Sequence, residues 1–221
     1  MKLFDRLKKD AGYRWTDYVE HEFVQNVGNG GLSKESFRHY LIQDYLFLVE
    51  FARAYALAIY KSPDVRHMNT ALLGVKAILE VELDLHVELC GKWGMSREDL
   101  ETSEEASANI AYTRFVLEAG MRGDLLDLLV ALAPCIVGYA EIGAELSRQT
   151  NPGGGIPHYQ RWIAEYAGDD YQNLTGAFGE WMDDVAETYL SENRYPHILE
   201  TFNRACRLES DFWQMGLDRS I

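Results

Sequence analysis

The sequence predicts an all-α protein, a single domain over residues 1–221 that folds as a bundle of about eight helices. Apolar residues recur with the helical period along most of the chain. β-branched residues are sparse, and no alternating stretch is bounded by the turn residues of a hairpin. Four of the five prolines stand where the helical period breaks, so they separate one expected helix from the next.

Capping residues and glycines place the expected helix ends. The glycine-rich residues 28–31 end the first helix, and Ser33 caps the second. Pro134 lies inside the fifth helix, where it removes one backbone donor. Residues 151–157 form a loop, because their many glycines and prolines disfavour both helix and strand. The expected helices cover about residues 3–27, 33–61, 64–91, 103–119, 124–150, 158–167, 170–190 and 197–216.

Composition narrows the class of partner. The chain carries 21 Lys and Arg against 35 Asp and Glu, a formal net charge of −14, which argues against nucleic acid as a partner. The three cysteines, Cys90, Cys135 and Cys206, lie too far apart for a disulfide framework or a metal knuckle, which favours a reducing compartment. The charged N-terminus does not match a secretory peptide, and the longest apolar run, residues 128–140, is shorter than a membrane span. We therefore expect a soluble, cytoplasmic protein.

Two acidic residues interrupt the apolar faces of their helices. Asp44 lies within the stripe of the second helix, which consists of Phe37, Leu41, Leu48, Phe51 and Tyr55. Glu209 lies within that of the last helix, which consists of Leu199, Phe202, Cys206, Phe212 or Trp213, and Gly216. The structural alternative for Asp44 is an acid paired with an interior Arg or Tyr, or a slightly rotated helix, and that for Glu209 is pairing with a buried arginine. Two inward acids on separate helices favour a shared pocket.

Cys135 lies on the apolar face of the fifth helix. A lone cysteine on such a face is most often a small packing residue. Its neighbours distinguish it from Cys90 and Cys206, because Pro134 kinks the helix beside it and Tyr139 lies one turn further on. This arrangement can open a pocket around the thiol.

The third helix contains Glu82 and His86, which could face a metal together. No histidine has a Glu three residues before it, as a di-iron bundle requires, so a solvated acidic face with one inward residue is the favoured interpretation. The chain also contains no G-x-S-x-G elbow and no phosphate-binding glycine loop. We predict neither a metal nor a cofactor.

Six short motifs, taken together and in this order, resemble the TenA family, also called thiaminase II. They cover essentially the whole chain. The motifs are Gln43-Asp44-Tyr45, Glu82-x3-His86, Tyr112, Ala133-Pro134-Cys135 with Gly138-Tyr139, Tyr159-x2-Trp162-Ile163-x2-Tyr166, and Leu208-Glu209-x2-Phe212-Trp213.

The resemblance implies a heme-oxygenase-like fold, a homotetramer and an aminopyrimidine aminohydrolase that acts in thiamin salvage. Such enzymes convert 4-amino-5-aminomethyl-2-methylpyrimidine to the 5-hydroxymethyl pyrimidine and ammonia, and members can also hydrolyse thiamin. By similarity Cys135 is the nucleophile, in the cysteine-containing branch of the family, and Asp44 and Glu209 are the pocket acids. The substrate-binding residues implied in the same way are Glu82, the phenols Tyr112, Tyr139 and Tyr166, and the aromatic walls Phe47 and Phe212.

The chemistry of an aminopyrimidine agrees with these residues. The ring offers a flat face to aromatic side chains and an edge that a carboxyl group can bind. We assign ring protonation to Glu209 and handling of the amino or leaving group to Asp44, although the sequence allows the two roles to be exchanged. Phe47 departs from the tyrosine of many relatives, so activity or substrate preference is expected to differ.

Two other functions compete with this hydrolase. One is a metal-dependent oxidase on the same fold, with Glu82, His86 and Asp44 as ligands. The other is a non-catalytic pyrimidine-binding or regulatory protein, which the missing phenol at Phe47 favours.

Overall fold

The computed structural model describes all 221 residues and consists of helices joined by short loops, with no strand. This confirms the predicted all-α class. The helices are α1 (Leu3–Ala11), α2 (Tyr13–Val19), α3 (Glu22–Asn29), α4 (Lys34–Lys61), α5 (Val65–Ala77), α6 (Leu83–Gly91), α7 (Arg97–Glu101), α8 (Ser107–Arg122), α9 (Leu125–Ser147), α10 (Pro157–Ala167), α11 (Asp169–Tyr189) and α12 (Tyr195–Asp218). A π-helical segment, η1 (Ile78–Glu82), joins α5 to α6, and a 3-10 turn, η2 (Pro152–Gly155), lies in the loop before α10.

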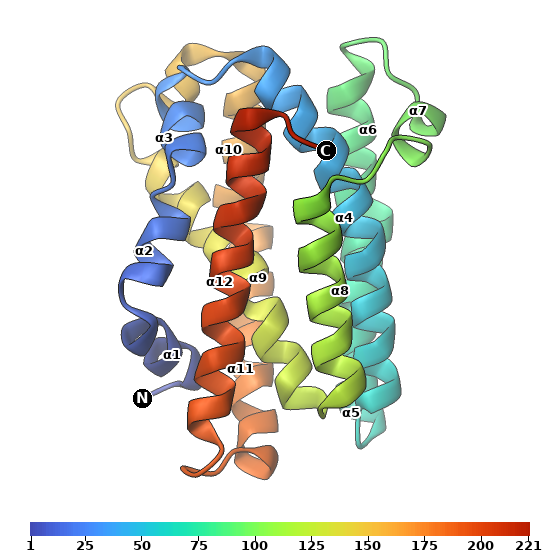
Figure 1. Cartoon of the computed structure of the whole chain (residues 1–221), viewed down its shortest axis with the longest axis vertical. Helices are drawn as coiled ribbons and strands as arrows, with labels where there is room; N and C mark the ends of the chain where they lie inside the picture. The colour runs from blue at the N-terminus through green and yellow to red at the C-terminus, as the bar shows by residue number, and fades with distance from the viewer.

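The long helix α9 lies at the centre of the bundle, where it contacts α4, α8, α10, α11 and α12 (Figure 1). It is apolar because it is buried on most sides. By length and composition it could cross a membrane, but 83% of its most apolar stretch is buried inside the protein, as in the core helix of a soluble bundle. One continuous core of 60 buried residues joins the helices.

The N-terminal segment differs from the prediction. One helix was expected over about residues 3–27, but the chain forms α1, α2 and α3 instead. Gly12 adopts a φ of 57°, a conformation that ends α1 and that glycine reaches at little cost. His21 then caps α3 by accepting a hydrogen bond from the backbone N–H of Phe23. These breaks let three short helices follow the side of the bundle (Figure 1).

One further helix was placed wrongly, and another contains a segment that was not expected. The fourth expected helix, residues 103–119, is α8 and runs from Ser107 to Arg122, and the separate short helix α7 precedes it. Ser96 and Asp99 form the capping box that starts α7. The expected third helix, residues 64–91, corresponds to α5 and α6, but the π-helical segment η1 lies between them.

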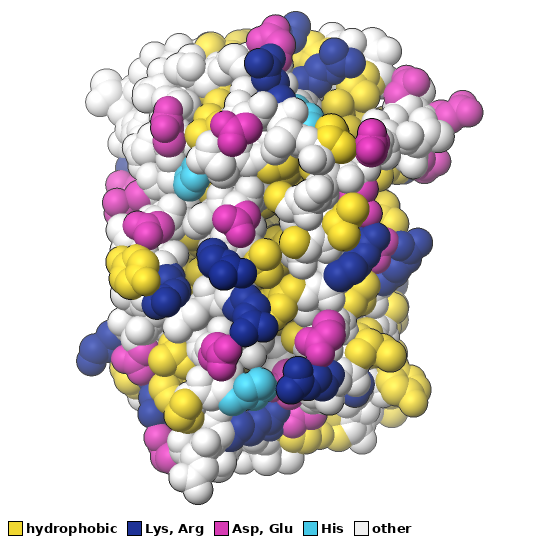
Figure 2. Space-filling model, in the orientation of Figure 1, with side chains coloured by type: hydrophobic (Ala, Val, Ile, Leu, Met, Phe, Trp, Pro, Cys, Tyr) yellow, Lys and Arg dark blue, Asp and Glu magenta, His cyan; other side chains and the backbone are white.

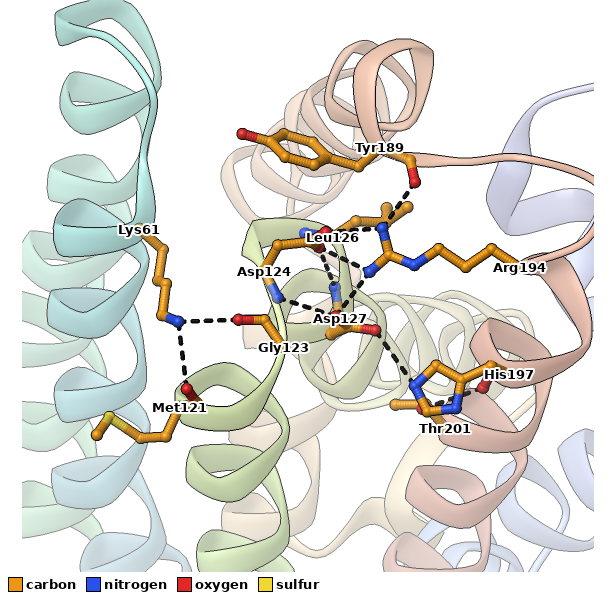
Figure 3. A network of polar contacts seen from close by, with 10 residues as sticks. All are labelled: Lys61, Met121, Gly123, Asp124, Leu126, Asp127, Tyr189, Arg194, His197 and Thr201. Atoms are coloured by element: carbon orange, nitrogen blue, oxygen red, sulfur yellow. Dashed lines mark hydrogen bonds and ion pairs between the residues drawn. The ribbon is translucent and has the colours of Figure 1, made fainter.

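Arg194 holds three helix ends together at one end of the bundle (Figure 3). Its guanidinium donates to both carboxyl oxygens of Asp124, to Asp127 Oδ2 at 2.7 Å and to the backbone oxygen of Tyr189. Lys61, at the end of α4, donates to the backbone oxygens of Met121 and Gly123 close by. Because these contacts fix where α9 and α12 begin, they also fix the register of both helices.

Candidate active site

Glu209 of α12 and Tyr112 of α8 meet in the interior. The Tyr112 hydroxyl donates to Glu209 Oε1 at 2.9 Å, and both residues are about 1% exposed. Burial raises the pKa of Glu209 to about 8, although the bond from Tyr112 acts in the opposite direction. No hydrogen bond engages Oε2. Glu209 is therefore a neutral acid near pH 7 with one free oxygen.

Asp44 of α4 belongs to a second polar group. Its Oδ2 accepts a hydrogen bond from the Tyr40 hydroxyl at 2.9 Å and lies 2.7 Å from His86 Nε2. The Tyr40 hydroxyl in turn accepts from Trp162 Nε1. Asp44 Oδ1 has no protein partner. The structural alternative expected for Asp44 is thus partly realised, since Asp44 pairs with a tyrosine. Glu209 pairs with Tyr112 and not with the expected arginine. Each acid also keeps one carboxyl oxygen free.

Cys135 of α9 is partly accessible, whereas Cys90 and Cys206 are buried. The pKa of the Cys135 thiol is raised well above its ordinary value by burial and then by the negative charge of Glu209, Asp44 and Glu82. All three carboxyl groups therefore lie within electrostatic range of the sulfur.

The backbone beside Cys135 is held by a phenol from α2. The Tyr18 hydroxyl donates to the oxygen of Pro134 at 3.2 Å. Its ring lies so close to Gly138 that a Cβ there would be 2.3 Å from a ring carbon. Only glycine accepts this approach one turn after the thiol.

Glu82 is the last residue of the π-helical η1 and is partly accessible at its surface. Burial nevertheless raises the pKa of its carboxyl to about 7, with the charge of Asp44 acting in the same direction and His86 opposing it. π-helical turns often occur at functional sites, because the extra residue changes which side chains face inward.

The aromatic residues predicted for substrate binding are all buried. Phe47 packs against Phe212 with ring centroids 5.6 Å apart, and against Tyr112 at 5.1 Å. Tyr139 and Tyr166 form an edge-to-face pair with centroids 5.0 Å apart. Two aromatic groups from α4, α8, α9, α10 and α12 thus line the interior around the polar residues.

The structure brings the predicted residues into one interior region, and it adds two partners of Asp44, Tyr40 of α4 and His86 of α6. Trp162 of α10 donates to the Tyr40 hydroxyl behind them. Tyr40 could have been found from the sequence, since it lies one turn before Asp44. The pairing of Asp44 with His86 across 42 residues had no local signal.

The ligand set of the oxidase alternative does not form. No group of three or more His, Cys, Asp or Glu side chains is arranged to hold a metal ion. Glu82 contacts His86 through its backbone oxygen, which accepts from Nδ1 at 2.8 Å, and not through its carboxyl. His86 Nδ1 is therefore unavailable as a ligand, and Nε2 faces Asp44.

A separate open cleft of about 480 Å³ lies where α8 ends and α12 begins. None of the predicted site residues lines it. Its arginines are paired with neighbouring acids: Arg194 with Asp127, and Arg204 with Glu200. Basic and acidic side chains are interspersed over this face, with no patch of one sign (Figure 2).

The chain is similar to known proteins along nearly its whole length. The sequence profile described as the TENA/THI-4/PQQC family matches residues 9–219. This chain belongs to that family. An aminopyrimidine aminohydrolase of Halalkalibacterium halodurans is 38% identical over 209 residues, which cover 94% of this chain and 92% of that protein.

Solved structures agree with the family. A TenA family transcription regulator from Silicibacter sp. TM1040 is 44% identical and superposes with a TM-score of 0.92, covering 97% of this chain and 96% of that one. A protein of unknown function from Shewanella denitrificans, described as having a heme oxygenase-like fold, is 11% identical and superposes with a TM-score of 0.76, covering 98% and 92% of the two chains. The heme-oxygenase-like fold is confirmed.

Proposed function

We propose that this chain is an aminopyrimidine aminohydrolase that acts in thiamin salvage. Its substrate would be 4-amino-5-aminomethyl-2-methylpyrimidine, and its products the 5-hydroxymethyl pyrimidine and ammonia. The observation that carries the proposal is the convergence of a partly accessible thiol, Cys135, with a neutral acid, Glu209, and a second carboxyl group, Asp44. The names of the relatives support the same reaction class, hydrolysis of a C–N bond.

Different residues of the site are suited to bind the face and the edge of the flat pyrimidine ring. Phe47 and Phe212, which pack against each other, offer aromatic surface to the ring. Asp44 Oδ1 is free to accept a hydrogen bond from the exocyclic amino group. Glu209 Oε2 is free to contact a ring nitrogen, and its raised pKa keeps a proton available there near neutral pH.

The reaction then proceeds by addition and elimination. The Cys135 sulfur adds to a ring carbon, its proton passes to a pocket carboxylate, and Glu209 protonates the ring nitrogen as charge accumulates there. Glu82 is suited to receive the thiol proton, because its pKa of about 7 is the lower of the two raised values. The C–N bond of the ammonium substituent then breaks and ammonia leaves. Water adds to the exposed methylene carbon and gives up one proton to solvent. The sulfur departs with the proton that Glu82 held, and the ring proton returns to Glu209, which restores all three groups.

Glu82 also favours a particular leaving group. Its pKa of about 7 leaves the carboxyl group partly ionised at neutral pH, and a carboxylate attracts a positively charged substituent. The aminomethyl group is an ammonium at neutral pH, and the thiazolium of thiamin is a permanent cation. Hydrolysis of thiamin to pyrimidine and thiazole is therefore a second reaction of the same site.

Replacement of Cys135 by Ser tests the nucleophile. The hydroxyl is a much weaker nucleophile at neutral pH, so ammonia release from the aminomethyl pyrimidine should fall by at least about 100-fold while the helical content is unchanged. Cys90→Ala is the matched control, since Cys90 is buried on α6 and takes no part in the reaction. An unimpaired Cys135→Ser enzyme would refute the covalent step.

A second candidate function is a regulatory pyrimidine-binding protein. Phe47 in place of a phenol and the solved structure described as a transcription regulator favour it. Binding of the pyrimidine without ammonia release would support this candidate and exclude the hydrolase. In either case we propose one domain over residues 1–221, assembled as a homotetramer in the cytoplasm.

A further inference from the structure

His86 is held by two hydrogen bonds in the interior. Its Nδ1 lies 2.8 Å from the backbone oxygen of Glu82, and its Nε2 lies 2.7 Å from Asp44 Oδ2. A carbonyl oxygen can only accept a hydrogen bond, so Nδ1 must carry a hydrogen. A neutral imidazole with its hydrogen on Nδ1 would direct the Nε2 lone pair at the carboxyl oxygen, so a second proton must lie between Nε2 and Oδ2.

Tyr40 and Trp162 indicate where that second proton lies. The Trp162 indole N–H can only donate, so the Tyr40 hydroxyl oxygen accepts from it and uses its own hydrogen to donate to Asp44 Oδ2. Oδ2 then accepts from Tyr40 on one side and faces His86 Nε2 on the other. Both bonds are charge-assisted, and therefore strongest, when the proton is on His86 and Asp44 is ionised.

We infer that His86 is a positioning residue, which together with Tyr40 holds Asp44 as an anion, saturates its Oδ2 and leaves Oδ1 to select ligands that carry an amino donor. The inference rests on the proposed function, because it assigns the role of one carboxyl group in that site. His86 and Asp44 are 1% and 4% exposed, so no bulk water competes for the pair.

The charges around His86 agree with this assignment. Burial alone would lower the pKa of His86, but the hydrogen bond and charge of Asp44, with the Glu82 backbone oxygen and carboxyl, outweigh burial and raise it. The pair is neutral as a whole, since one cation and one anion share the hydrogen bond. It can therefore persist in the interior without a further partner.

The arrangement predicts a ligand preference. An ionised Asp44 with only Oδ1 available can accept a hydrogen bond but cannot donate one. A pyrimidine with a 4-amino group satisfies this oxygen, whereas one without the group leaves it desolvated and unpaired. The wild-type protein should thus bind 4-amino-2,5-dimethylpyrimidine at least about tenfold more tightly than 2,5-dimethylpyrimidine. Neither probe has a leaving group, so the measurement does not depend on turnover.

The experiment compares the binding of these two pyrimidines by calorimetry in the wild type, His86→Leu and His86→Gln. Leu can make neither hydrogen bond of the imidazole, so Asp44 is no longer held as an anion. The preference for the amino compound should then fall to about twofold or less. Gln can still donate from its amide to Asp44 and should retain most of the preference. His67→Gln is the control, because His67 is also buried but accepts from Trp181 outside the site.

The outcomes of this experiment distinguish a failure of the His86 inference from a failure of the proposed function. Full preference in His86→Leu refutes the role of His86 and leaves the hydrolase proposal intact if ammonia release is measured in the wild type. No binding of either pyrimidine by the wild type refutes the proposed function and the inference with it. If His86→Leu does not fold, the ¹⁵N spectrum of the wild type decides. Two protonated ring nitrogens on His86 at neutral pH support the inference, and one refutes it.

Discussion

The carboxyl groups of Asp44 and Glu209 lie in the same interior but have different partners. Asp44 accepts from Tyr40 and lies against His86, whereas Glu209 accepts only from Tyr112. Acids whose environments differ in this way can divide an acid and a base role between them at one pH. This difference supports Glu209 as the acid in the proposed reaction, a choice that the sequence left open.

Glu209→Gln should change both activity and the pH dependence of stability. Loss of the proton donor should lower kcat by about 100-fold or more, measured as ammonia release. Burial raises the pKa of Glu209 from 4.5 to about 8 in the folded protein, so the folded state holds this proton more tightly than the unfolded chain. That contribution to stability is complete below pH 4.5 and is lost as the pH rises through about 8.

The variant has no group to ionise at this position. Its free energy of unfolding should therefore decline less than that of the wild type between about pH 6 and pH 9, as urea titrations would show. Glu187→Gln removes an exposed acid and should follow the wild type. Parallel curves for all three proteins would contradict a raised pKa at Glu209.

Single site residues could be predicted from the sequence where the apolar pattern of one helix was enough to identify them. Asp44 and Glu209 each interrupt an apolar stripe, and the structure buries both. The contact of Asp44 with His86 could not be predicted. The helical period reports which face of a helix is buried and not which helix that face contacts. His86 enters the site only through the packing of α6 against α4.

At the scale of elements, the long helices could be predicted from their capping residues, whereas the short helices at the N-terminus were not predicted. Ser33 predicted the start of α4, and its side chain accepts from the backbone N–H of Ser36. The π-helical η1 had no signal in the sequence, yet it sets the direction of Glu82 relative to α5. Gly12 was a visible helix breaker, and its positive φ is the physical reason that α1 and α2 separate.

The clamp around Arg194 should contribute strongly to stability. Arg194→Ala would leave Asp127 buried without its cation and would free the ends of α9, α11 and α12 (Figure 3). We expect the free energy of unfolding to fall by about 2 kcal/mol, measured by urea denaturation.

Arg204→Ala is the matched control for this clamp. It breaks an exposed pair with Glu200 one turn away on α12 and a contact over the Phe115 ring at 5.8 Å, so it should change stability by less than about 0.5 kcal/mol. Equal losses in the two variants would show that Arg194 is no more than a surface charge.

At the scale of the whole molecule, exposed apolar side chains are concentrated on one segment. Seven of the twelve large exposed hydrophobic residues fall within residues 60–81, on the end of α4, on α5 and on η1. A monomer rarely leaves such a patch in water, and a symmetric assembly covers the same patch on each copy. This concentration supports the homotetramer proposed for the chain.

Leu73→Glu should weaken that assembly. Leu73 is 66% exposed, so the change costs little within one subunit, but it places a charge in a contact between subunits. Light scattering coupled to gel filtration should show a smaller assembly for this variant than for the wild type. Tyr13→Glu is the control, because Tyr13 is 65% exposed but lies on α2, which contacts α1, α9 and α12 and not the patch. A wild-type monomer, or an unchanged assembly in Leu73→Glu, would mean that this surface is not the one that the subunits share.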